Sequence, residues 1–200
     1  MEFINTSVEE LQEGRDKIGR REGIVIEKGV VLTDDYLEKN QKLFERYCQT
    51  FSAYPDIFLD VIKQENDSFS LFYYQRIILR ALMRYKEVYV CACRATSKSF
   101  LSILALYLQC IFMPGTKRFI VATYKRQAAK VAKEKIFEIY QHWPLLRKEV
   151  IGGDISETPG NFGADYVTLK FRNGSQLDVV GGDGTRGLRR NGGLLDELRD

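Results

Sequence analysis

The feature that most constrains this chain is a change of hydrophobic period within a dozen residues. Residues 88–93 are a short β-prone apolar run, residues 94–97 are a tight polar loop, and residues 98–113 are a long apolar segment that Pro114 ends. The first segment predicts a strand and the last predicts a buried helix. A strand that leads through a tight loop into a helix is typical of α/β proteins.

The rest of the chain repeats the alternation of strands and helices. Further strands are expected at residues 119–122, 166–171, 176–180 and 194–196, and helices at 33–51, 56–63, 69–85 and 124–143. Asn173 and Gly174 predict a hairpin turn, because this pair accepts positive φ angles. We therefore predict an α/β fold with a mainly parallel sheet. Residues 1–66 form a mainly helical N-terminal appendage, and residues 67–200 form the core.

The net charge of +3 hides a strong regional asymmetry. Residues 67–150 hold 15 Lys and Arg against 5 Asp and Glu, a net charge of +10, whereas the flanking regions carry −5 and −2. This distribution indicates a core that handles anions. Arg76, Arg80 and Arg84 share one helix face, which we interpret as solvated. The start of the chain has no signal-peptide pattern, and the longest apolar run is too short to cross a bilayer.

The loop before the long helix has the chemistry of a phosphate site. A helix N-terminus presents several backbone N–H groups and a positive dipole end to an anion. Lys98 adds a mobile charge for phosphates, and the hydroxyl of Ser99 can bind Mg²⁺. The usual phosphate-loop motif has glycine at two positions where this chain has Ala92 and Ser97. The motif alone is therefore a weak signal.

Two other segments strengthen this interpretation. Leu194 and Leu195 lead into Asp196 and Glu197, so an apolar strand ends in two carboxylates that could hold a metal ion and activate a water molecule. Gln75 follows three aromatic residues and lies 23 residues before the lysine of the loop. Its amide could read an adenine edge while a neighbouring aromatic ring stacks on the base.

Together these segments resemble the ATPase domain of bacteriophage terminase large subunits, the motors that package DNA into capsids. The resemblance covers most of the chain and is strongest over residues 93–100, with Arg94 near the start of a deviant phosphate loop. Further similar elements are residues 36–40, residues 54–56, the 119–123 strand and Arg186 with Gly187.

The resemblance implies an ATP–Mg²⁺ site and assigns its residues. Asp196 and Ser99 would hold the metal, Glu197 would activate water, and Lys98 and Arg94 would act on the phosphates. Arg186 or Arg189 would be the arginine finger that neutralises transition-state charge. The ATP-binding residues would be Gln75, Ala92, Cys93, Arg94, Ala95, Thr96, Ser97, Lys98 and Ser99.

The resemblance also implies partners and a location. The expected partners are double-stranded DNA, a portal protein and a small terminase subunit. The motor would be a homo-oligomeric ring in the cytoplasm of the infected bacterial host, with no membrane contact. We expect residues 1–200 to be the front part of a longer motor that also carries a nuclease domain. The alternatives are a helicase-like nucleic-acid-dependent ATPase and a degenerate phosphate-loop protein with a structural or assembly role.

Overall fold

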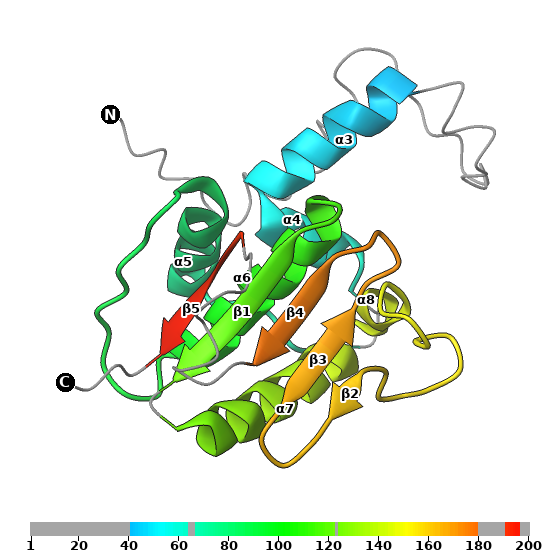
Figure 1. Cartoon of the computed structure of the whole chain (residues 1–200). Coiled ribbons are helices and arrows are strands. Elements are labelled where there is room, and N and C mark those ends of the chain that lie inside the picture. Colours follow the sequence, from blue (N-terminus) through cyan, green and yellow to red (C-terminus); the bar gives the residue numbers. More distant parts are fainter. Residues whose placement is uncertain (1–40, 64–66, 123, 180–190, 197–200) are drawn as a thin grey trace. The chain divides into compact units, whose positions relative to one another are not determined.

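Five strands form one mixed sheet in the computed structural model of the chain, in the order β2-β3-β4-β1-β5 (Figure 1). The strands are β1 (Lys117–Ala122), β2 (Asn161–Phe162), β3 (Val167–Lys170), β4 (Gln176–Val179) and β5 (Gly192–Asp196). β1 pairs in parallel with β4 and with β5, whereas β3 is antiparallel to both of its neighbours, β2 and β4. The predicted α/β class is confirmed, and the sheet is parallel around β1.

The structure describes residues 41–63, 67–122, 124–179 and 191–196. The chain divides into two compact units, Met1–Glu45 and Arg46–Asp200, and nearly all described residues belong to the second. The domain boundary expected near residue 66 stays a prediction.

Six helices are described, and most match the expected segments. They are α3 (Gln41–Ala53), α4 (Pro55–Val61), α5 (Tyr73–Arg84), α6 (Lys98–Phe112), α7 (Lys125–His142) and the short α8 (Pro144–Lys148), the expected apolar helix being α6. α5 begins four residues later than its periodicity suggested. None of the described helices combines the length and the apolarity needed to cross a membrane.

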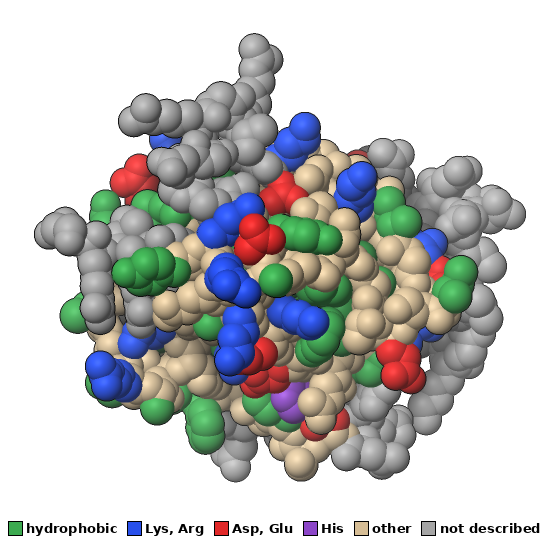
Figure 2. Space-filling model, turned by 60° about the horizontal axis from the view of Figure 1, so that its bottom comes forward, with side chains coloured by type: hydrophobic (Ala, Val, Ile, Leu, Met, Phe, Trp, Pro, Cys, Tyr) green, Lys and Arg blue, Asp and Glu red, His purple; other side chains and the backbone are tan. Residues whose placement is uncertain are grey.

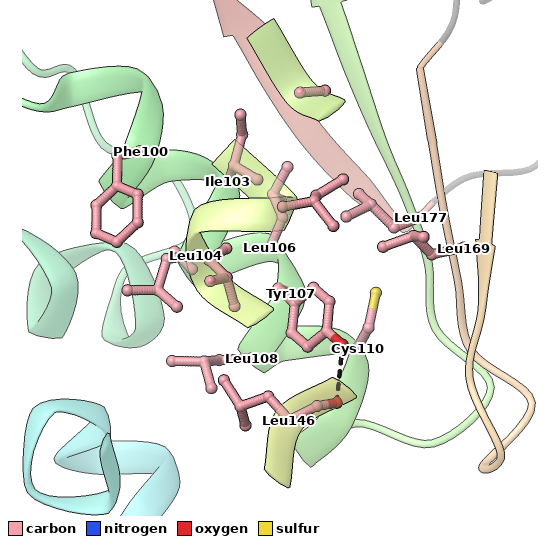
Figure 3. Close-up of a cluster of buried hydrophobic side chains, with 14 of the residues drawn as sticks. Phe100, Ile103, Leu104, Leu106, Tyr107, Leu108, Cys110, Leu146, Leu169 and Leu177 are labelled. Atoms are coloured by element: carbon pink, nitrogen blue, oxygen red, sulfur yellow. Dashed lines mark hydrogen bonds between the residues drawn. The ribbon is translucent and has the colours of Figure 1, made fainter. Parts of the chain in front are cut away.

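Burial of α6 forms the centre of the core. Nine of its fifteen residues are buried, because it packs against the sheet and also contacts α5 and α7 (Figure 3). Leu177 of β4 and Leu169 of β3 point into the same cluster, and both are almost fully buried. The Tyr107 hydroxyl, also within this core, donates a hydrogen bond of 2.9 Å to the Leu146 carbonyl at α8. The sequence of α6 is therefore apolar around nearly the whole helix, because the sheet and other helices surround it.

The predicted hairpin turn connects β3 and β4 and also ends α6. Gly174 adopts a φ of 80°, as the Asn-Gly pair predicted. The Asn173 amide donates to the Cys110 and Ile111 carbonyls at 2.8 and 2.9 Å. These carbonyls lie in the last turn of α6, where intrahelical donors are missing. The turn thus joins the sheet to the C-terminal end of the core helix.

The strand predicted at residues 88–93 is wrong. This segment has no regular secondary structure, and Tyr89 is 95% exposed. An apolar β-prone run becomes a strand only where a neighbour accepts its hydrogen bonds. Both sides of β1 are taken by β4 and β5, and residues 88–93 do not pair with the outer edge of β5 either.

Leu104 provides a test of the core. Leu104→Ala is expected to lower the free energy of unfolding by about 2–5 kcal/mol, because it removes a side chain that has no solvent exposure and leaves a cavity. Leu145→Ala in α8 is the matched control, since Leu145 is 50% exposed and should change stability by about 0.5 kcal/mol or less. Urea denaturation measures both, and equal losses would contradict this description of the core.

Candidate functional site

The loop at residues 92–97 lies at the carboxyl edge of the parallel strands. α6 and β1 run side by side in opposite directions, because only residues 113–116 connect them. At 1.5 Å per helical residue and 3.3 Å per strand residue, the two elements are both about 20 Å long. The Lys98 end of α6 is therefore at the same edge as the end of β1. The register pairs Ala122 with Asp196, so β5 also ends there.

The backbone of this loop alternates in handedness. Ala95 has a φ of 65° and Ser97 a φ of 57°, and these are the only described residues other than glycine with positive φ. Thr96 between them and Lys98 after them have negative φ. Alternation of this kind turns successive N–H groups toward one point and makes a concave anion site. The left-handed conformation of Ser97 occurs where phosphate loops have glycine.

The ammonium group of Lys98 is bound to its own loop. Its Nζ donates to the carbonyls of Ala92 and Cys93 at 2.8 and 2.7 Å. The Thr96 hydroxyl donates to the same Cys93 carbonyl at 2.8 Å. Two side chains thus close the loop around its own carbonyl oxygens. The amide of Leu101 donates to the Ser97 carbonyl at 2.9 Å, so the helix begins directly after the loop.

The other loop side chains differ in exposure. Arg94 is exposed and has no ion-pair partner among the described residues. Ser99 is partly buried in the first turn of α6. The residues at hand therefore fit a phosphate group: a concave run of N–H donors, a helix N-terminus, a lysine and an exposed arginine within one loop. An adjacent hydroxyl fits a divalent cation held beside that phosphate.

Gln75 has a structural task that the sequence did not reveal. Its side chain is 5% exposed, and its Oε1 accepts the backbone N–H of Phe72 at 2.9 Å, which caps the start of α5. Its Nε2 has no hydrogen-bond partner among the described residues. The expected adenine contact would therefore rest mainly on the NH₂ group, because the carbonyl oxygen already accepts the hydrogen bond of the helix cap.

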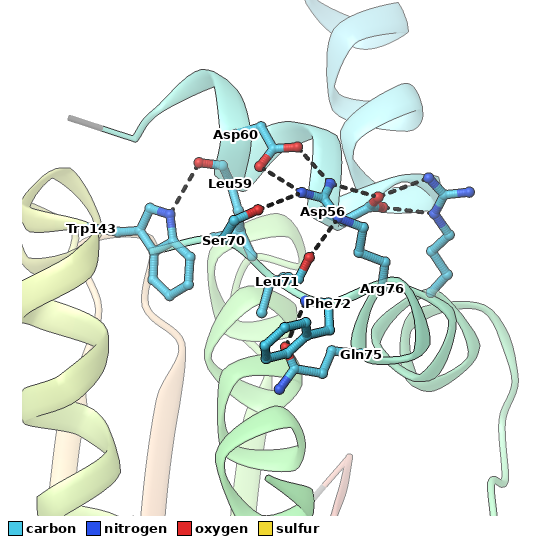
Figure 4. Close-up of polar contacts among 10 residues, drawn as sticks. Asp56, Leu59, Asp60, Ser70, Leu71, Phe72, Gln75, Arg76 and Trp143 are labelled. Carbon is cyan, nitrogen blue, oxygen red and sulfur yellow. Dashed lines mark hydrogen bonds and ion pairs between the residues drawn. The ribbon is translucent and has the colours of Figure 1, made fainter. Parts of the chain in front are cut away.

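A buried carboxylate holds α5 against α4 (Figure 4). Asp56 of α4 is completely buried and accepts hydrogen bonds from Arg80 Nε at 2.7 Å and from a terminal nitrogen at 2.8 Å. Arg76 binds Asp60 at 2.5 and 3.1 Å and also reaches Asp56 at 3.5 Å. The network determines where α5 and its Gln75 lie.

The electrostatics of this network agree with its geometry. Burial lowers the pKa of Arg76, but its interactions with Asp60 and Asp56 outweigh burial and raise the pKa above its usual value. The hydrogen bond with Asp56 likewise raises the pKa of Arg80. The interpretation of Arg76 and Arg80 as a solvated face is therefore wrong. The i,i+4 spacing of arginines on α5 matches the i,i+4 spacing of aspartates on α4, and that match was the available signal.

The structure leaves part of the expected site undescribed. Glu197, Arg186 and Arg189 lie outside the described residues, and so does Thr123. Asp196 is described only as the last residue of β5. The described part brings the loop, Lys98, Ser99 and the end of β5 to one edge of the sheet. The roles of Glu197 as the water-activating base and of the two arginines as fingers stay predictions.

Strain in the loop can be measured directly. Ser97→Gly is expected to raise the free energy of unfolding by about 0.5–1 kcal/mol. Left-handed φ costs a residue with a Cβ about 1–2 kcal/mol, and the added freedom of glycine in the unfolded chain offsets part of this. Arg94→Gly, in the same loop at negative φ, should instead be destabilising by about 0.4–1 kcal/mol. Thermal or urea unfolding that ranks the two variants the other way would contradict the strained loop.

The buried carboxylate of α4 gives a second test. Asp56→Ala should lower the free energy of unfolding by about 3 kcal/mol, because Arg76 and Arg80 then lose the partner of a buried ion pair. Asp165→Ala is the control: Asp165 pairs with Lys125 at 3.6 Å, both side chains are about half exposed, and the cost should stay below about 1 kcal/mol. Chemical denaturation of both variants distinguishes the buried network from an ordinary surface pair.

Comparison with known proteins adds no family to this geometry. No protein-family model matches the chain, and no curated protein matches it. The chemistry of the site is therefore argued from the loop, its lysine and the sheet edge.

Proposed function

We propose that this chain binds ATP with Mg²⁺ at residues 92–99 and hydrolyses it as the motor of a terminase large subunit. One observation carries the proposal: a loop of alternating φ, followed by Lys98 and Ser99, stands at a helix N-terminus on the carboxyl edge of parallel strands. Such an edge, with a helix N-terminus that faces it, is where open α/β sheets bind phosphates. The fold within that class would be a P-loop NTPase core.

The residues of this chain have distinct tasks in the proposed reaction. The N–H groups from Ala95 to Ser99 bind phosphate oxygens. Lys98 exchanges the carbonyls of Ala92 and Cys93 for the phosphates and stabilises the charge that develops there. Ser99 and Asp196 would hold Mg²⁺, which when bound would offset the negative charge of the phosphates. Glu197 would orient the attacking water and accept its proton.

The hydrogen bonds between Lys98 and its own loop affect the affinity for nucleotide. Two of the three N–H groups of the charged Lys98 ammonium already donate to loop carbonyls, and moving the ammonium to a phosphate breaks these hydrogen bonds. Each such bond contributes on the order of 1.5–3 kcal/mol, so the loop itself competes with the nucleotide. The phosphate must interact with Lys98 more strongly than the two carbonyls do, and its full negative charge makes this possible.

The wider role follows the same proposal. Hydrolysis would move double-stranded DNA into a capsid, with a portal protein and a small terminase subunit as partners and a ring of identical subunits as the working form. The location would be the cytoplasm of the infected bacterial host.

A second candidate is nucleotide binding without hydrolysis. Ala95 and Ser97 keep side chains at strained left-handed positions, and Lys98 is already satisfied by loop carbonyls. These features favour a loop that binds phosphate weakly and serves an assembly role. Equilibrium titration with a non-hydrolysable ATP analogue and Mg²⁺ separates the candidates from a chain that binds no nucleotide.

DNA-stimulated ATP hydrolysis by the full-length protein is the decisive measurement. Lys98→Ala is expected to lower turnover by about 10²–10³-fold, because it removes a preorganised charge from the transition state. Glu197→Ala should abolish hydrolysis while it leaves analogue binding intact. Lys86→Ala is the matched control, since Lys86 is an exposed lysine twelve residues earlier in the chain, and its turnover should equal wild type. Unchanged turnover in Lys98→Ala or Glu197→Ala would refute the assigned roles.

A further inference from the structure

α7 carries a band of cations on its outward side. Arg126, Lys130 and Lys133 lie four and three residues apart, so they fall on one helix face, and all three are exposed. At 1.5 Å per residue, the band is about 10 Å long. An adjacent face of α7 is buried in the core through Ala128, Ala129, Ala132, Ile136, Ile139 and Tyr140. Figure 2 brings forward the lower side of Figure 1, where α7 lies, and shows Lys and Arg side chains gathered across the middle of it.

None of the three cations has an ion-pair partner among the described residues. Two acidic side chains nearby pair with other lysines: Asp165 with Lys125 at 3.6 Å and Glu138 with Lys135 at 2.7 Å. Glu134, four residues after Lys130, is exposed and forms no ion pair among the described residues, and it offsets one charge of the band. The first turn of α7 holds no acidic residue, although a helix N-terminus favours acids and disfavours cations. The positive potentials of the band and of the helix dipole therefore add together. This arrangement costs stability unless an anion binds it.

The exposed face of α7 suits a rod of negative charge better than a lipid surface. A helix that binds a membrane inserts apolar side chains on the side that faces the lipid, and the apolar side of α7 is already buried. Duplex DNA carries one negative charge per about 1.7 Å of its axis, so a 10 Å band faces several phosphates at once. Lys133 has its Nζ 5.6 Å from the Phe137 ring centre, an interaction that orients its stem along the helix.

We infer that Arg126, Lys130 and Lys133 form a contact surface for the phosphate backbone of double-stranded DNA. The inference rests on the proposed function, because it names the surface by which the motor grips its substrate. α7 begins at the carboxyl edge of β1, where the phosphate loop also lies. The band therefore starts beside the nucleotide site and leads away from it along the helix. Contacts of this kind depend on charge and carry no sequence preference.

The test is the salt dependence of duplex binding by the full-length protein without nucleotide. The probe is a fluorescent duplex of mixed sequence, titrated from low to physiological salt. Each phosphate contact contributes about 0.9 to the slope of log K against log salt. Arg126→Ala/Lys130→Ala/Lys133→Ala should thus lower the slope by about 2.7, and Lys130→Ala alone by about 0.9. Circular dichroism and urea unfolding verify that the variants are folded.

A matched triple variant controls for net charge. Lys117→Ala/Lys148→Ala/Lys170→Ala removes three exposed lysines near the opposite edge of the sheet, and its slope should stay at the wild-type value. An α7 variant with an unchanged slope, or a control variant with the same loss, would overturn the inference. So would loss of binding to anionic lipid vesicles with duplex binding intact. The assay contains no nucleotide, so its result does not depend on ATP hydrolysis. Failure of the DNA-binding inference can therefore be distinguished from failure of the proposed ATPase function.

Discussion

Burial of α6 is the constraint on which the other elements depend. A helix with nine buried residues must be covered by the sheet on one side and by α5 and α7 on others. Its C-terminal carbonyls are satisfied by Asn173, and its N-terminus emerges at the carboxyl edge of β1. The same burial that stabilises the core therefore places Lys98 at that edge. Chemistry at the loop depends on packing along the whole length of the helix.

The candidate site combines a rigid support with a strained loop. The Asp56 network holds α5 to α4 through charges that are largely withdrawn from water, so Gln75 has a defined position. By contrast, Ala95 and Ser97 keep left-handed conformations that cost free energy. Strain of this kind is typical of ligand-binding loops, and here it coincides with a concave row of N–H donors.

Charge is distributed in two different ways around this core. Arg76 and Arg80 are neutralised by aspartates and serve the structure. Arg126 and Lys130 have no described acidic partner, although they belong to the same basic region of the sequence. Counting charges along the chain could not separate these groups, because neutralisation depends on residues that lie 16 to 24 positions away. Only the unpaired group remains for an external anion.

The sequence by itself determined the local elements. Periodicity predicted α6, α7 and β1, the Asn-Gly pair predicted the turn between β3 and β4, and Lys98 with Ser99 marked the loop, because each depends on neighbours along the chain. Tertiary structure decided the rest. Residues 88–93 have β propensity but pair with no described strand, and Gln75 is partly used as a helix cap. Strand pairing and charge neutralisation join residues far apart in the chain, and periodicity contains no information about such partners.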